Sequence, residues 1–304
     1  MADRLMLLDT ASLYFRAFYG VPDTVKAPDG TSVNAARGLL DMIAKLVSAY
    51  EPTHVIACWD DDWRPQWRVD LIPTYKTHRV AEVVADDTDI EEVPDPLTAQ
   101  IPVIRDELAV LGIPVVGHAD HEADDVIASY ATQHAGAVDV VTGDRDLFQL
   151  VDDTRSVRVI YTGRGMSKLD VLDDAAVVEK YGVLASQYAD FAVLRGDASD
   201  GLPGVAGIGE KTAAALLAAH GDLAGILSEA ARGGLSASVR AKILAATDYL
   251  AVAPRVVEVV RTLDLPAVGA PLRSPDPAAT ARVDAEWNLG APLARAIAAI
   301  TARA

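Results

Sequence analysis

Nine carboxylates in this chain fall in short stretches that each end a predicted β-strand or begin a predicted helix. They are Asp9 after RLMLL, Asp60 after HVIACW, Glu122, Asp124 and Asp125 in HEADD, Asp144 and Asp146 in TGDRD, and Asp197 and Asp200 in RGDASD. Carboxylates a few ångströms apart resist joint ionisation unless cations neutralise them. Oxygen ligands without His or Cys suit Mg²⁺ or Mn²⁺ better than zinc. The pattern therefore predicts a divalent-metal site for phosphodiester chemistry.

The first half of the chain alternates strand signals and helix signals. Short apolar runs over 5–8, 53–59, 113–116 and 138–142 predict buried strands, and amphipathic stretches over 34–49, 102–111 and 124–134 predict helices. This alternation predicts an α/β fold with a parallel sheet covered on both faces. In such sheets ligands gather beyond the carboxyl ends of the strands, so we expect the separated acids to meet there.

The rest of the chain has a different character. The segment at about 75–96 begins with the basic TYKTHR and turns acidic, which predicts an excursion above the site. From Tyr181 the pattern is helical, over 184–194, 209–220 and two Ala-rich helices between 222 and 253. Residues 265–281 are expected to be irregular and 292–302 to form a last helix. We therefore expect a core at 1–180, a helical region at 181–264 and a segment at 265–304 that packs back on the core.

Composition limits the choice of function only weakly. Of the 304 residues 51% are hydrophobic, the single Cys58 lies in an apolar run, and no stretch has the length of a signal peptide or membrane span. We expect a cytoplasmic protein with a buried, inert thiol. A net charge of −17 first argues against nucleic acid. Much of that charge is the acid cluster and seven further acids between Glu82 and Asp95, so local basic patches could still hold a phosphate backbone.

Two further stretches suit phosphate contacts. In LPGVAGIGEKTAAALL, glycines open directly into a helix with Lys211 in its first turn, an arrangement whose free backbone N–H groups can bind phosphate. A plain turn between helices is the alternative interpretation. Arg64, Arg68, Lys76 and Arg79 are interleaved with Trp63, Trp67 and Tyr75. Each alone is an ordinary surface charge, but together they predict phosphate contacts with aromatic stacking on bases.

Taken together, these stretches resemble the structure-specific 5′-nuclease family, which includes flap endonucleases and the N-terminal 5′-3′ exonuclease domain of bacterial DNA polymerase I. The similar stretches are LLDTASLYFRAFYG, WDD with WR and YKTHR, LGIPVV with HEADDVIASYA, VVTGDRDLFQLV, and LRGDASDGLPGVAGIGEKTAAALL, over about residues 4–225. The resemblance implies a PIN-like α/β nuclease core, a helical arch, and a helix–three-turn–helix module of the helix-hairpin-helix type.

The resemblance also implies roles for single residues. Asp9, Asp60, Glu122 and Asp124 resemble one metal group, and Asp125, Asp144, Asp146, Asp197 and Asp200 resemble a second, for two or three Mg²⁺ or Mn²⁺ ions. It implies catalytic roles for Lys76, Arg79, Asp124 and Asp146, and DNA contacts for Arg16, Arg68, Lys76, Arg79, Gly207, Gly209, Lys211 and Thr212. A K⁺ ion at the loop of the helical module is a further implication.

The implied activity is 5′-flap endonuclease and 5′-3′ exonuclease cleavage of flap, nicked or gapped DNA and of RNA primer–DNA junctions, in replication and repair. We expect a stand-alone monomer, nucleoid-associated and working alongside DNA polymerase and ligase. Two features depart from the family: the arch stretch is long and acidic, and Asp60, Asp61 and Asp62 are consecutive, so Asp60 or Asp61 could be the ligand. Because its acids repel phosphate, we expect 81–95 to be mobile and solvent-facing.

Two other functions are compatible with the acid cluster. A PIN-type ribonuclease would share the acidic core but would lack GVAGIGEK. A catalytically inactive protein that binds DNA junctions would be expected to have lost some of the nine acids, and all nine are present. Both features favour the nuclease.

Overall fold

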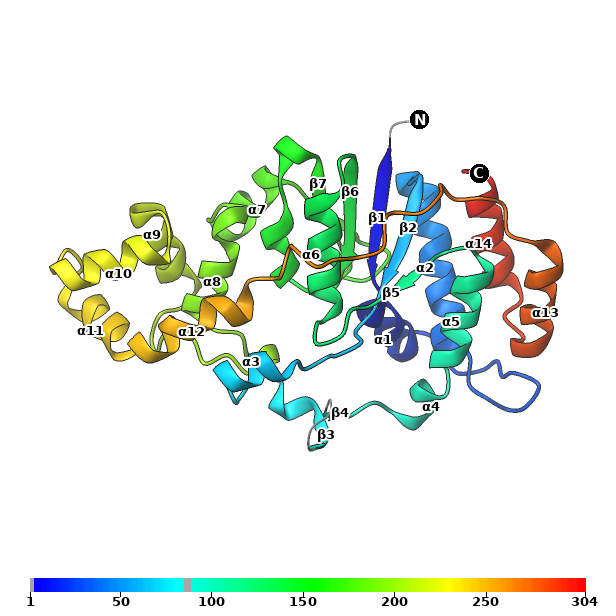
Figure 1. The fold of residues 1–304 in the computed structure, drawn as a ribbon, viewed down its shortest axis with the longest axis horizontal. Coiled ribbons are helices and arrows are strands. Elements are labelled where there is room, and N and C mark those ends of the chain that lie inside the picture. Colours follow the sequence, from blue (N-terminus) through cyan, green and yellow to red (C-terminus); the bar gives the residue numbers. More distant parts are fainter. Residues whose placement is uncertain (1–2, 85–88) are drawn as a thin grey trace.

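A six-stranded sheet forms the centre of the protein in its computed structural model, which describes residues 3–84 and 89–304 (Figure 1). The strand order is β5 (Val115–Val116), β2 (His54–Cys58), β1 (Arg4–Asp9), β6 (Ala137–Thr142), β7 (Val157–Tyr161) and β8 (Asp170–Leu172). All neighbouring strands are parallel except β7 and β8, which are antiparallel. The predicted parallel sheet is confirmed, and β7 and β8 extend it beyond the four predicted strands.

The two faces of the sheet are read directly from the alternation in β1. Leu5 and Leu7 face one hydrophobic cluster, whereas Met6 and Leu8 face the other, and none of the four is exposed. The helices α1 (Thr10–Gly20), α2 (Asn34–Tyr50), α5 (Ile101–Val110) and α14 (Ala291–Thr301) cover the second face, and α6 (Ala123–Gln133), α7 (Asp174–Tyr181) and α8 (Tyr188–Arg195) cover the first. Each such buried leucine contributes about 1.5–3 kcal/mol.

Helices dominate the sequence after β8. α9 (Glu210–His220), α10 (Leu223–Arg232), α11 (Ala237–Ala245) and α12 (Thr247–Val257) follow α8 and lie to one side of the sheet (Figure 1). Where two helices were expected there are three, because Gly233 at φ 84° ends α10 and the Ser236 side chain caps α11. An extended strap, 258–276, then leads to α13 (Pro277–Trp287). The irregular region therefore ends at 276 and not at the expected 281, because Asp276 caps α13.

The segment expected above the site lies beyond the carboxyl end of β1 (Figure 1). It contains a 3₁₀ turn (Thr77–Arg79), a hairpin of β3 (Val80–Glu82) and β4 (Ile90–Glu91), and the start of α4 (Asp95–Thr98), and α3 (Gln66–Leu71) precedes it. We call 75–96 the arch segment. We expected residues 81–95 to be mobile and solvent-facing, and part of that stretch, residues 85–88, lies outside the described ranges. None of the helices within those ranges is long and apolar enough to span a bilayer.

One buried carboxylate belongs to the core and not to the site. Glu107 on α5 is fully buried, and neither of its oxygens has a hydrogen-bond partner among the described residues. Burial raises the pKa of Glu107 well above its usual range. The unfolded chain therefore releases a proton that the folded chain keeps, and the free energy of unfolding should fall as pH rises through and above about 4.5.

Replacing Glu107 with methionine, Glu107→Met, should stabilise the protein by about 2 kcal/mol at pH 8, because a neutral, unpartnered acid gives way to an apolar chain of similar size. Urea unfolding at pH 5 and pH 8 measures the effect, and the gain should be smaller at pH 5. Glu107→Gln is the control that removes the titration and keeps an unpartnered polar group. An equal gain at both pH values would contradict the assignment.

Candidate active site

The carboxylates meet at a cavity of about 240 Å³ beyond the carboxyl ends of β1, β2 and β6. Its charged lining residues are Asp9, Asp60, Lys76, Arg79, Glu91, Glu122, Asp124 and Asp144. We call this the acid pocket. Five of the nine carboxylates predicted to bind metal line it, and both arch residues predicted to bind phosphate lie among them.

The β1 end of the acid pocket is fixed by hydrogen bonds between neighbouring strands. Asp9 ends β1 and caps α1, accepting from the Ser12 backbone N–H at 3.2 Å and from the Thr142 hydroxyl at 2.6 Å. Gly143 N–H donates to the Ser12 hydroxyl at 3.0 Å, and a Cβ on Gly143 would lie 2.6 Å from that oxygen. A side chain at residue 143 would therefore displace the Ser12 hydroxyl from the loop that carries Asp144.

The positions of Asp60 and Asp61 bear on which of the two is the predicted metal ligand. The Asp60 carboxylate lines the acid pocket and accepts from the Ala123 backbone N–H at 2.8 Å, at the start of α6. Asp61 lies instead against Gly117, where an added Cβ would be 2.3 Å from the Asp61 carboxyl carbon. These positions support Asp60 as the proposed ligand.

Charge in the acid pocket is poorly compensated. Burial raises the pKa of Asp9 to about 7, with Asp60 and Asp144 adding to the effect against a bond from Thr142. Burial, Asp144 and Asp9 raise the pKa of Asp124 well above its usual range. Such shifts mean that the carboxylates would ionise together only with added positive charge. A divalent cation would supply it, and its binding would release protons.

Of the second predicted group, Asp144 lines the acid pocket, and Asp146, Asp197 and Asp200 lie near it. Asp146 N–H donates to Asp144 at 2.9 Å, and Asp146 Oδ1 is buried with no hydrogen-bond partner in the described part of the chain. Burial and Asp144 raise the pKa of Asp146, and burial raises that of Asp200 to about 6 although Lys76 opposes it. Asp197 accepts from Ser199 N–H at 2.9 Å and pairs with Arg195 at 3.1 Å.

The donor set fits a hard cation. Within residues 3–84 and 89–304 no three His, Cys, Asp or Glu side chains are grouped closely enough to form a ready-made cage. Mg²⁺ does not require one, because it usually takes one or two carboxylates and completes its shell with water and substrate phosphate. The orphaned oxygen of Asp146 and the raised pKa of Asp124 are the features that a cation would satisfy.

Glu122 lines the acid pocket and is already paired with basic side chains. Burial alone would raise its pKa, but Lys76 and Arg68 outweigh burial and lower it. The Lys76 ammonium contacts one Glu122 oxygen, and the Tyr75 hydroxyl donates to the other at 2.7 Å. Lys76 is buried, and its backbone N–H donates to the Asp200 carbonyl at 3.0 Å. The base of the arch segment is thus attached to both acid groups.

Close packing secures that attachment. The Thr74 hydroxyl donates to the Gly201 carbonyl at 2.8 Å, and a Cβ on Gly201 would lie 2.1 Å from the Thr74 carbonyl oxygen. Arg79 Nη2 lies 3.7 Å from Asp200 and donates to the Ser199 carbonyl at 3.3 Å. Lys76 and Arg79 therefore lie where a phosphate entering the acid pocket would meet them.

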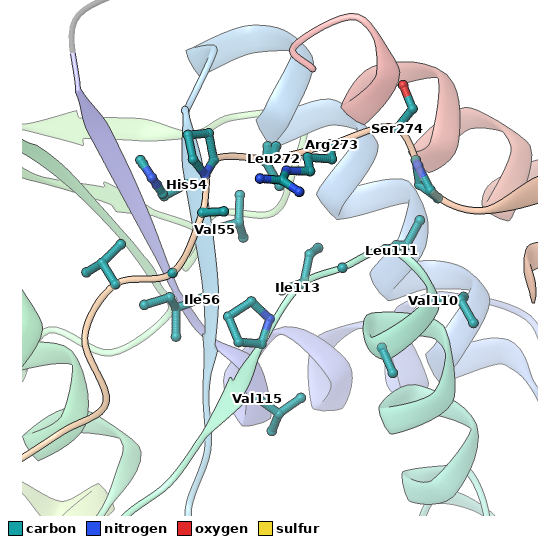
Figure 2. Close-up of a pocket in the computed structure, with 18 of the residues that line it drawn as sticks. His54, Val55, Ile56, Val110, Leu111, Ile113, Val115, Leu272, Arg273 and Ser274 are labelled. Atoms are coloured by element: carbon teal, nitrogen blue, oxygen red, sulfur yellow. The ribbon is translucent and has the colours of Figure 1, made fainter.

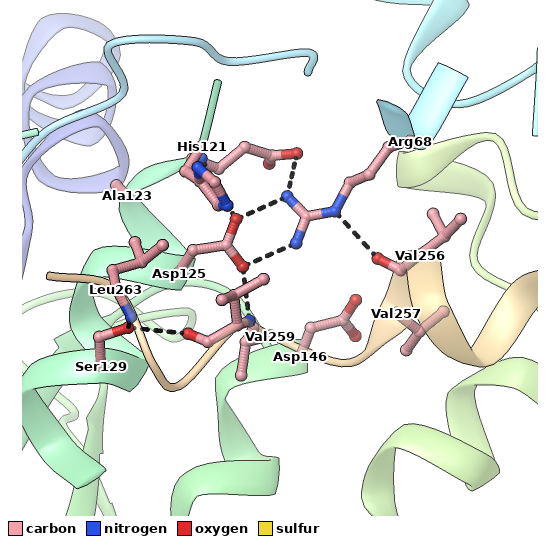
Figure 3. Close-up of polar contacts among 12 residues, drawn as sticks. Arg68, His121, Ala123, Asp125, Ser129, Asp146, Val256, Val257, Val259 and Leu263 are labelled. Atoms are coloured by element: carbon pink, nitrogen blue, oxygen red, sulfur yellow. Dashed lines mark hydrogen bonds and ion pairs between the residues drawn. The ribbon is translucent and has the colours of Figure 1, made fainter. Parts of the chain in front are cut away.

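Two predicted site residues have other roles (Figure 3). Asp125 is fully buried, pairs with Arg68 at 2.8 and 3.0 Å, and accepts from Val260 N–H at 2.8 Å. Asp125 does not line the acid pocket, and its carboxylate is already engaged by Arg68 and the Val260 N–H, which argues against the predicted metal contact. Arg68 is also buried, with Asp125 and Glu122 as partners, which argues against the DNA contact that we expected. Adjacent acids on a helix point in different directions, which the sequence pattern does not show.

The acidic stretch of the arch segment contributes more than expected. Glu91 lines the acid pocket, and its pKa is raised by burial against the opposing effect of Arg79. Asp89 forms a buried ion pair with Arg64, and its carbonyl accepts from Trp63 Nε1 at 2.7 Å. The expectation that 81–95 is solvent-facing is therefore wrong for residues 89 and 91. The sequence signal was present, since both lie in the acid-rich stretch, but their direction was not predictable.

The glycine loop of the helical region precedes α9 as predicted. Gly204 and Gly207 have φ of 65° and 77°, and Gly209 is the N-cap residue of α9. Lys211 is exposed in the first turn, with half-buried Thr212 beside it. Lys242 Nζ from α11 donates to the Gly207 carbonyl at 2.9 Å, a cation that the motif did not indicate.

Arg16 lies at the edge of the acid pocket. Its Nε is buried with no hydrogen-bond partner in the described ranges, and an added Cβ on Gly143 would lie 3.4 Å from its Nη2. Arg16 lines a neighbouring cavity of about 700 Å³ that shares Ser12 and Phe15 with the acid pocket. This position suits the expected DNA contact, which remains a prediction.

A larger cavity of about 770 Å³ lies away from the chemistry (Figure 2). It is enclosed by β2, β5 and the strap, with apolar residues such as Ile56, Ile113 and Leu272 facing it. Asp276 is the only carboxylate among its lining residues within the described ranges. Size alone therefore does not identify the active site.

A mainly parallel sheet, an acid pocket at its carboxyl edge and an adjoining helical region define a PIN-like nuclease. Residues 4–182 match the family model described as 5′-3′ exonuclease, N-terminal resolvase-like domain, and residues 183–278 match 5′-3′ exonuclease, C-terminal SAM fold. The chain belongs to the 5′-3′ exonuclease family and is an enzyme that hydrolyses phosphodiester bonds.

Relatives and solved structures agree with this assignment. The chain is 57% identical to a 5′-3′ exonuclease of Streptomyces coelicolor, covering 98% of this chain and 100% of that protein. A 5′-3′ exonuclease of Mycobacterium tuberculosis is 46% identical, with 97% of each covered. In fold the chain resembles T5 5′-exonuclease with bound zinc, at TM-score 0.65, 18% identity and 98% coverage of both chains. The catalytic core of Rad2 in complex with DNA substrate follows at TM-score 0.59 and 17% identity, covering 98% of this chain and 91% of that one.

Proposed function

We propose that this enzyme is a divalent-metal-dependent DNA 5′-nuclease that cuts 5′ flaps and removes nucleotides in the 5′-to-3′ direction. The observation that carries the proposal is the acid pocket, where buried carboxylates with raised pKa values lie beside Lys76 and Arg79. The T5 and Rad2 structures contain metal ions and DNA substrate respectively, which supports both components.

We propose that Mg²⁺ or Mn²⁺ ions bind Asp9, Asp60, Glu122, Asp124 and Asp144 and, for a second ion, Asp146, Asp197 and Asp200. Bound metal would supply an activated water and a Lewis acid for the phosphate. Lys76 and Arg79 would stabilise the charge that develops on the scissile phosphate. The Lys76 ammonium would then exchange its contact with Glu122 for one with phosphate, with a 5′-phosphate on the product.

Cleavage of a labelled 5′-flap duplex with Mg²⁺, with Mn²⁺ and with EDTA tests this function. We expect cutting near the flap junction with either metal and none with EDTA. A parallel reaction on single-stranded RNA tests the ribonuclease alternative. Cleavage of RNA alone, or binding of the flap without cutting in any metal, would overturn the proposal.

We propose that the loop before α9 binds the backbone of duplex DNA. Lys211→Ala should weaken duplex binding about equally for all sequences and lower the salt slope by about one phosphate contact. The reason is its exposed position in the first turn of α9, at the amino end of the helix. Fluorescence anisotropy at several salt concentrations measures both quantities. Lys180→Ala is the control. It also removes one lysine charge, but that lysine pairs with Asp170, so the salt slope should stay unchanged. An unchanged slope in both variants would make the loop a structural turn.

The K⁺ ion remains a proposal for the same loop. Its backbone carbonyls suit a monovalent cation, but Lys242 Nζ already occupies one face of the Gly207 carbonyl. We also retain the division at 180 and 264, the monomeric state, the nucleoid location, and a role in primer and flap removal beside DNA polymerase and ligase as proposals. The similarity to DNA polymerase I of Mycobacterium tuberculosis, 42% identical over 245 residues, 26% of that protein, supports the role in primer and flap removal.

A further inference from the structure

We infer that Arg68 is a positioning residue that fixes Glu122 and, through it, Lys76, and that it ties the acid pocket to the last helix of the helical region. The inference rests on the proposed metal role of the acid pocket. It assigns a function to a residue that neither contacts the pocket cavity nor is exposed to DNA.

All three nitrogens of the Arg68 guanidinium donate hydrogen bonds (Figure 3). Nη1 donates to Glu122 at 2.9 Å and to Asp125 at 3.0 Å, and Nη2 donates to Asp125 at 2.8 Å. Nε donates to the Val256 carbonyl at 3.2 Å. Its planar fork therefore joins three separate parts of the chain, α3, α6 and α12, in one fixed geometry.

Glu122 is the point where this network reaches the chemistry. The oxygen that accepts from Arg68 also accepts from the Tyr75 hydroxyl at 2.7 Å, and the other contacts the Lys76 ammonium. By binding Oε1, Arg68 therefore sets the orientation of the Glu122 carboxylate and leaves Oε2 facing Lys76. A rotated Glu122 would displace the ammonium from the place where phosphate must meet it.

The third contact, with Val256, reaches the helical region. Val256 lies in the last turn of α12, and its neighbour along the strap, Val260, donates to Asp125 at 2.8 Å. The same strap bonds to Ser129 through the Val260 carbonyl at 3.0 Å and the Leu263 N–H at 3.1 Å. Arg68 therefore gives the helical region a rigid connection to a side chain of the acid pocket.

A purely structural ion pair is the competing explanation. Removing Arg68 alone would leave Asp125 buried and unpaired, and such losses usually cause severe destabilisation. The informative variant is therefore Arg68→Met combined with Asp125→Asn. It leaves no unpaired charge at residue 125, retains an acceptor for the Val260 N–H, and still removes the guanidinium from Glu122.

The experiment compares this double variant with Ser129→Ala, which loosens the same strap without touching Glu122. Four quantities are measured: melting temperature, Mn²⁺ affinity by calorimetry, single-turnover flap cleavage in saturating Mg²⁺, and the salt slope of duplex binding. For the double variant we expect cleavage at least fivefold slower and Mn²⁺ binding at least threefold weaker, with an unchanged salt slope. Ser129→Ala should change neither cleavage nor Mn²⁺ affinity, even where its melting temperature falls equally.

The outcomes separate the explanations. A salt slope lowered by about one would make Arg68 a phosphate contact and overturn the inference. Cleavage and Mn²⁺ affinity both at wild-type levels would reduce Arg68 to a structural partner. If the wild-type protein cleaves no flap but binds Mn²⁺ more tightly than the double variant, the proposed substrate fails while the positioning role of Arg68 stands.

Discussion

Replacing Asp124 or Asp146 with asparagine is expected to slow flap cleavage at least about a thousandfold, ~4 kcal/mol of barrier, while duplex binding stays within about twofold. Both carboxylates are buried with raised pKa values, and Asp146 has an oxygen with no partner in the described chain. An amide cannot supply the negative charge that a cation needs at either position. Single-turnover cleavage in Mg²⁺ and anisotropy with Ca²⁺ measure the two effects.

Asp125→Asn is the matched control for this prediction. Residue 125 is next to Asp124 on α6, but its carboxylate faces Arg68 and the strap instead of the acid pocket. Its cleavage rate should fall less than tenfold. A near-wild-type rate for Asp124→Asn, or loss of cleavage in Asp125→Asn, would show that the wrong acid has been assigned to the metal.

Replacing Lys76 and Arg79 together with alanine should lower the single-turnover rate at least tenfold, about 1.4 kcal/mol of barrier. Both line the acid pocket, and Lys76 is held by Glu122 and the Asp200 carbonyl. Both positive charges already lie in the acid pocket before phosphate arrives, and they would stabilise the charge that develops on it once Lys76 exchanges its contact with Glu122. Rates should be measured at saturating enzyme, so that weaker binding does not mask the chemical effect.

The control for the double variant leaves the base of the arch segment intact. A Gly-Ser-Gly-Ser sequence in place of 85–88 keeps Asp89, which pairs with Arg64, and Glu91, which lines the acid pocket. Its rate should fall less than threefold. Equal damage from both changes would mean that the acidic tip itself takes part in catalysis.

The sequence was sufficient for the parts of this protein that follow from periodicity and strand ends. Strand–helix alternation predicted the parallel sheet, and a parallel sheet places the ends of β1, β2 and β6 together whatever the distance along the chain. Asp9, Asp60 and Asp144 are therefore neighbours for a topological reason. β7 and β8 were not predicted, because they lie outside the stretches where strand and helix signals alternated most clearly.

Side-chain direction was the part that could not be predicted. Asp124 and Asp125 are one residue apart, yet one lines the acid pocket and the other forms a buried ion pair. Arg68 looked like a surface cation because its partners come from α6 and α12, far away in sequence. Such partners are fixed only by tertiary packing, and local patterns carry no information about them.

The contacts of the strap have a consequence for the enzyme during its synthesis. Seven of the nine metal-binding candidates have been synthesised once the chain reaches residue 146. The Val256 carbonyl and the Val260 N–H, which bind Arg68 and Asp125, are added more than a hundred residues later. Domains usually fold as units as they emerge. An unfinished chain would carry its acids without the support that orients Glu122, so a nascent polypeptide would be a poor nuclease. Nuclease activity would therefore arise only late in translation, once the strap has been synthesised and has packed against Arg68 and Asp125.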